Sequence, residues 1–76
     1  MPSPEALQTL LLAAFPTARV EVNDLTGTAD HFQAVVVAQE FHGKSRIEQH
    51  KMVYAALGEL MTGGAIHALA LTTRAP

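Results

Sequence analysis

The sequence predicts an α+β fold, a two-layer sandwich in which a three-stranded mixed sheet carries two helices on one face. Two stretches place apolar residues at helical spacing behind capping residues, and three shorter stretches alternate or are rich in β-formers. Their order along the chain is α-β-β-α-β. Two helices on one face of the sheet is the simplest arrangement that buries both apolar stripes.

The first helix is expected to begin at Ser3-Pro4-Glu5, which places an N-cap, a proline at the first helical position and an acid in the first turn. Pro16 ends it. Its apolar stripe follows the i, i+3, i+4, i+7 pattern and consists of Leu7, Leu10, Leu11 and Ala14.

Two antiparallel strands are expected next, at residues 19–25 and 31–38, joined by turn residues 26–30. The second strand is apolar on both faces at its centre, which predicts a position in the middle of the sheet. One of its faces carries Phe32, Ala34, Val36 and Ala38, and the other carries His31, Gln33, Val35 and Val37.

The longest element is a helix that runs from an N-cap at Ser45 to about Met61. Glu48 lies three residues after Ser45 and completes a capping box. Gly63 and Gly64 supply the left-handed residue that commonly ends a helix. The predicted core stripe is Ile47, His50, Tyr54, Leu57 and Met61.

The third strand is expected at residues 65–72, with 73–76 as a short tail of a single domain that spans residues 1–76. A right-handed crossover through the long helix makes this strand parallel to the second. Its alternation sets Ile66, Ala68 and Ala70 against His67, Leu69 and Leu71.

Composition narrows the possible functions. The chain has 76 residues, 49% of them hydrophobic, which allows one small core. A formal net charge of −2 disfavours general binding to nucleic acid or anionic membranes. The absence of cysteine excludes disulfides, thiolate zinc sites and thiol nucleophiles within the chain. With no long apolar run and no signal-peptide pattern, we expect a cytoplasmic protein that does not enter a membrane.

No catalytic motif is present, so an enzyme is the least favoured class. Gly43-Lys44-Ser45 resembles the end of a phosphate-binding loop, but Ala38 stands where that loop needs a glycine. A domain of this size also has little core volume for a pocket of convergent polar groups.

The four histidines are the remaining candidates for chemistry, because histidine is the commonest metal ligand. We interpret His42 as a solvated loop residue and His50 as a half-buried packing residue. His31 and His67 stay open between a structural and a functional role, since a polar ring in an apolar strand is costly unless it is paired or used. No two histidines have i, i+4 helical spacing, so any metal would need ligands from a second protein.

Four motifs occur in one order along the chain: His31-Phe32, Phe41-x-Gly43-Lys44, His50-x-x-Val53-Tyr54 and Ile66-His67-Ala68-Leu69. In these motifs the sequence resembles the BolA family, and the resemblance covers nearly its whole length. In the family a Thr-Pro-x-x-Trp segment and a short helix usually follow the last strand, and residues 73–76 lack that pattern.

The resemblance implies a class II KH-like fold and a partnership with monothiol glutaredoxins, in complexes that can hold a [2Fe–2S] cluster. His67 matches the family's cluster ligand. The family's second ligand, a Cys or His, falls near Thr28 here, which leaves His31 as the nearest candidate. Thiolates from glutaredoxin and glutathione would complete the cluster, because a chain without cysteine cannot hold one alone.

Two functions follow as hypotheses. The first is an adaptor in iron–sulfur and iron homeostasis that binds a monothiol glutaredoxin and can share the cluster, with the region of residues 44–51 in the contact. The alternative is a nucleic-acid-binding transcriptional regulator that binds DNA through a basic patch of Lys44, Arg46 and Lys51. Alone, the chain is expected to be a monomer or a weak homodimer.

Overall fold

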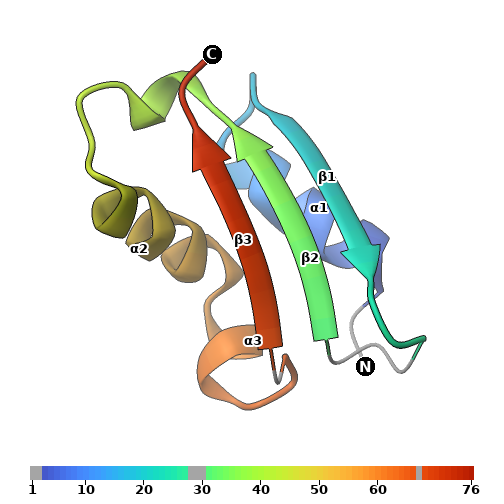
Figure 1. Ribbon diagram of the computed structural model, residues 1–76. Helices are drawn as coiled ribbons and strands as arrows, with labels where there is room; N and C mark the ends of the chain where they lie inside the picture. The colour runs from blue at the N-terminus through green and yellow to red at the C-terminus, as the bar shows by residue number, and fades with distance from the viewer. Residues whose placement is uncertain (1–2, 28–30, 67) are drawn as a thin grey trace.

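The computed structural model describes residues 3–27, 31–66 and 68–76 and confirms the predicted order of elements (Figure 1). Two short helices, η1 and α3, add to that order. The elements are α1 (Pro4–Ala14), β1 (Arg19–Asp24), β2 (His31–Val37), η1 (Gln39–Phe41), α2 (Arg46–Leu57), α3 (Glu59–Thr62) and β3 (Ala68–Arg74).

The three strands form one mixed sheet in the order β1-β2-β3. β1 is antiparallel to β2, and β3 is parallel to β2, as a crossover through α2 requires. β2 therefore occupies the middle of the sheet, as predicted. Both long helices cover the same face, so the opposite face of the sheet has no helix over it (Figure 1).

The core lies between this sheet and the two long helices. Phe32, Ala34 and Val36 of β2 are fully buried there, and Ala38 continues the same face just beyond the strand. The predicted partition of β2 is thus confirmed on the covered side. The other face, from His31 to Val37, is only half-buried.

α1 begins as predicted, because the Ser3 side chain accepts a hydrogen bond from the Ala6 amide and Pro4 is the first helical residue. The predicted stripe is only half right. Leu7 and Leu11 are buried, whereas Leu10 is 38% exposed and Ala14 is exposed. The buried face of the helix is therefore narrower than the face that the i, i+3, i+4, i+7 pattern predicts.

α2 has the predicted capping box. Ser45 Oγ accepts from the Glu48 amide at 3.1 Å, and Glu48 Oε1 accepts from the Ser45 amide at 3.1 Å. These two bonds satisfy amides that the first turn of a helix leaves without partners.

The predicted core stripe of this helix is wrong at Ile47 and Tyr54, whereas Leu57 is buried, Met61 packs against the core and His50 is half-buried. Val53 and Leu57 are buried, with Met52 and Ala56 packed beside them, whereas Ile47 is 69% exposed and Tyr54 39% exposed. The reason is that α2 carries two overlapping apolar stripes. The aliphatic one has no polar atom to desolvate, while the other includes a phenol and an imidazole whose polar tips reach water.

The long helix also ends earlier than predicted. Gly58 has φ 55° and ψ −125°, a conformation that favours glycine, and it separates α2 from the single turn of α3. Gly63 and Gly64 end α3 rather than the long helix, with Gly64 at φ 80°. Leu60 and Met61 still pack against the core from this turn.

β3 is shifted towards the C-terminus relative to the prediction. It spans Ala68–Arg74 rather than residues 65–72, so Thr73 and Arg74 belong to the strand and not to a tail. Leu69 and Leu71 face the core side, and Ala68 and Ala70 are exposed. The strand extends because β2 offers partners as far as Val37, which pairs with Arg74.

Candidate functional site

His31 is the first residue of β2 and lies on the face of the sheet that has no helix over it, since its neighbour Phe32 is buried on the covered face. The imidazole is half-buried, and the backbone carbonyl accepts a hydrogen bond from the Leu25 amide at 2.8 Å. In the parallel ladder His31 pairs with Ala68. The structure therefore places His31 beside the first residue of β3.

His67, the other predicted ligand, lies outside the described residues, as does Thr28. Its neighbour in sequence, Ala68, is the residue that pairs with His31. The role of His67 as a ligand thus stays a prediction, and so does the pairing of His31 with it.

The remaining two histidines lie elsewhere. His42 is exposed in the turn after η1, which agrees with its interpretation as a loop residue. His50 is half-buried on α2, and its ring meets the edge of Tyr54 with centroids 6.3 Å apart and planes at 69°. A depression of about 280 Å³ joins Arg46 and His50 to residues 71–73 of β3. Thr72 is four residues beyond Ala68, or about 13 Å along the strand, so His50 and His31 belong to different regions.

The metal-ligating side chains of this chain fit an iron–sulfur cluster only if a second protein supplies the other ligands. A [2Fe–2S] cluster is held by four ligands, mostly thiolates, of which two can be replaced by histidines on one iron. This chain has no cysteine, and no group of three or more metal-ligating side chains occurs within residues 3–27, 31–66 and 68–76. Of the thiolate and imidazole ligands that hold such clusters, this chain has only imidazoles, and a partner would have to supply the thiolates.

Basic residues gather around the start of α2. Lys44, Arg46 and Lys51 are exposed there, next to the turn in which Gly43 adopts φ 75°. The amide and hydroxyl of Ser45 hold the pKa of Glu48 below its ordinary value of 4.5, with smaller help from Lys44 and Lys51. The first half of α2 and the residue before its N-cap therefore combine three exposed basic side chains with one carboxylate whose pKa is lowered.

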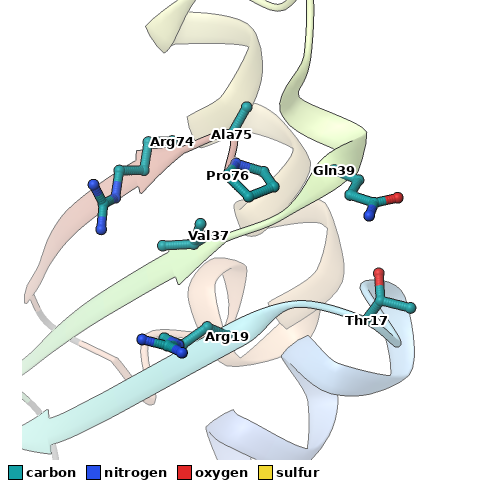
Figure 2. A pocket seen from close by; sticks show the side chains of 7 residues that line it. All are labelled: Thr17, Arg19, Val37, Gln39, Arg74, Ala75 and Pro76. Atoms are coloured by element: carbon teal, nitrogen blue, oxygen red, sulfur yellow. The ribbon is translucent and has the colours of Figure 1, made fainter.

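A second depression, of about 460 Å³, lies at the end of the sheet where β1 begins and β3 ends (Figure 2). Sequence reasoning missed it, because strand register alone brings Arg19 and Arg74 to either side of Val37. Because residues 73–76 were predicted to be a tail, Arg74 was not expected to lie in a strand beside Val37. The lining residues are Thr17, Arg19, Val37, Gln39, Arg74, Ala75 and Pro76.

The family of BolA-like proteins has a sequence profile that matches residues 11–76. The chain belongs to the BolA-like family. Over 71 residues it is 34% identical to the uncharacterized protein RP812 of Rickettsia prowazekii, a match that covers 93% of this chain and 91% of RP812. It is also 34% identical to the DNA-binding transcriptional regulator BolA of Escherichia coli, with 91% of this chain and 71% of the regulator covered.

Human BolA-like protein 1 is 44% identical over 50 residues, which are 66% of this chain but only 36% of the human protein. The chain thus spans about a third of that relative. Among solved structures, the crystal structure of a bol-like protein from Babesia bovis superposes with a TM-score of 0.87 at 26% identity, covering 100% of this chain and 87% of that one. The BolA-like fold predicted from the sequence is confirmed.

The names of these relatives describe a regulator, a BolA-like protein and an uncharacterized protein, and none of them is the name of an enzyme. In the described part of the chain, no helix has the length and apolar character needed to span a bilayer. The predicted cytoplasmic location stays a prediction.

Proposed function

We propose that this BolA-like protein is a non-enzymatic adaptor that binds a monothiol glutaredoxin and shares a [2Fe–2S] cluster with it in iron–sulfur and iron homeostasis. The observation that carries the proposal is the pairing of His31 with Ala68, the residue next to His67. It supports two imidazoles being offered from the same end of the sheet by a chain that has no thiolate. Glutaredoxin and glutathione would supply the thiolates.

In this proposal each part of the chain has a limited task. His67 and His31 offer neutral imidazole nitrogens. The backbone of His31 is held by the hydrogen bond from the Leu25 amide and by the pairing with β3, and the residue is half-buried. The cluster itself would supply electron-transfer or cluster-delivery chemistry. The exposed side of α2 would provide contact area for the glutaredoxin.

The test is to mix the protein with cluster-loaded glutaredoxin and to record visible absorption and circular dichroism together with co-elution. We expect a changed spectrum and a complex, and we expect the spectral change to be lost in His67→Ala and reduced in His31→Ala. His42→Ala is the matched control, because that histidine is exposed in a turn of the same chain. Unchanged spectra without co-elution would refute the adaptor.

A second candidate function is DNA binding, which one specific observation favours. The Escherichia coli relative is named a DNA-binding transcriptional regulator, and this chain exposes Lys44, Arg46 and Lys51 at the start of α2. Three phosphate contacts predict a plot of log affinity against log salt with a slope of about −3 on duplex DNA. Anisotropy of labelled oligonucleotides at two salt concentrations measures it, and no binding at low salt removes this function.

A further inference from the structure

The face of the sheet without helices ends in a row of two arginines and a valine. Arg19 pairs with Val37 across β1 and β2, and Val37 pairs with Arg74 across β2 and β3. Neighbouring strands lie about 4.8 Å apart, so the two arginine backbones are about 10 Å apart with Val37 between them. Residues at opposite ends of the sequence are thus held at a fixed spacing by the sheet.

Both arginine side chains are free to act on a ligand. They are exposed, and they point to the same side as Val37 in Figure 2. Neither forms an ion pair with a carboxylate in the described part of the chain. They are two of the five basic residues in a chain whose net charge is −2, and the register of the sheet brings them to one row. An anion between them would relieve the repulsion of like charges.

The surroundings make a depression rather than a flat surface. It has a volume of about 460 Å³ and is walled by Thr17, Gln39 and the segment that follows β3. Val37 is half-buried between the arginines, in the middle of the row. In Figure 2 the Thr17 and Gln39 side chains point away from the two arginine side chains, so the guanidinium groups are the polar groups on the side of Val37.

We propose that Arg19 and Arg74 form a clamp for one phosphate group, carried by a small phosphate monoester or free in solution. A guanidinium group matches phosphate with two parallel hydrogen bonds, and the pair can approach the same anion from two sides of Val37.

The next row of the sheet limits the ligand to a single phosphate. It carries Glu21, which lies two residues from Arg19 on the same face of β1 and opposes Val35. That carboxylate repels a second anion placed along the strands. Within the described residues the row of Asn23, Gln33 and Ala70 that follows has no aromatic side chain on which a base could stack. A single phosphate is therefore favoured over a nucleic acid strand.

The test is a titration of the folded protein with inorganic phosphate and with glycerol phosphate, followed by amide and arginine side-chain NMR at constant ionic strength. We expect saturable shifts at Arg19, Val37 and Arg74 with both ligands. Arg19→Gln and Arg74→Gln should each weaken binding about tenfold, as expected for the loss of a charge-assisted contact. Arg19→Lys is the matched variant, because it keeps the positive charge but removes the two parallel hydrogen bonds of the guanidinium group; it should weaken binding less than Arg19→Gln.

The clamp is refuted if chloride at equal ionic strength produces the same shifts, or if neither Arg19→Gln nor Arg74→Gln weakens the binding of phosphate. It is also refuted if a short single-stranded oligonucleotide binds this row more tightly than inorganic phosphate. Because Arg19 and Arg74 are exposed, the substitutions should leave the fold unchanged, which the same spectra verify. The result is independent of the glutaredoxin assay, which depends on His31 and His67.

Discussion

Truncation of Val53 tests which face of α2 holds the protein together. Val53 is fully buried in the core, and Val53→Ala removes two methyl groups. Their transfer out of water is worth about 1.6 kcal/mol at roughly 0.8 kcal/mol each, and incomplete collapse of the resulting cavity adds to this. We expect a loss of about 2–3 kcal/mol in the free energy of unfolding. For a domain of this size that corresponds to a fall in Tm of about 10–20 °C.

The matched control is Ile47→Ala on the same helix. Ile47 is a larger side chain but is 69% exposed, so its truncation should change the free energy of unfolding by less than about 0.5 kcal/mol. Urea denaturation of both variants, followed by far-ultraviolet circular dichroism, measures the two free energies of unfolding. The dependence of the free energy on urea concentration should be the same in both variants. If Ile47→Ala costs more than Val53→Ala, the face of α2 described above is wrong and the stripe predicted from the sequence is right.

Three further predictions concern single residues. Gly58→Ala should lower the free energy of unfolding by about 1–2 kcal/mol, because φ is 55° there and an alanine would be strained. The added Cβ has no close contact, since the nearest atom, the Ala55 carbonyl oxygen, is 3.9 Å away. An unchanged urea midpoint would contradict this. Thr73→Val should stabilise the protein by about 1 kcal/mol. The buried Thr73 hydroxyl has no hydrogen-bond partner among the described residues, and valine has the same shape. A loss of stability would show that the hydroxyl does form a hydrogen bond. Because the pKa of Glu48 is lowered in the folded protein, its contribution to stability is complete above pH 4.5 and disappears as the pH falls through the folded-state pKa. Thermal unfolding between about pH 6 and pH 3 should show this loss of stability. Ser45→Ala should make the loss smaller.

The features predicted correctly from the sequence depend on neighbours in the chain. The N-cap at Ser3 and the capping box at Ser45 each depend on only three or four consecutive residues. The apolar composition of β2 on both faces predicts its position in the middle of the sheet. Strand directions followed from the order of elements and the handedness of crossovers.

The errors arose where tertiary packing chooses between local alternatives. α2 has two apolar stripes of similar spacing, and only the contact with α1 and β3 selects the one that contains Val53. Gly58 lies within a pattern that otherwise continues to Met61, so the break depended on a backbone conformation that glycine permits but does not require.

The candidate sites divide in the same way. His31 and His67 were identified through the family resemblance, and periodicity alone left both roles open. The row of Arg19, Val37 and Arg74 could not be predicted, because it depends on the register of β1 and β3 against β2, and the strand now known to reach Arg74 was expected to end earlier.

The pair of Tyr54 and His50 rings on α2 gives this protein an intrinsic optical reporter. Tyr54 is the only tyrosine and the chain has no tryptophan, so all useful near-ultraviolet emission comes from one position. Because that phenol is 39% exposed beside His50, its emission is sensitive to what covers α2. When a glutaredoxin docks on this helix, the emission of the mixture should differ from the sum of the emissions of the two separate proteins.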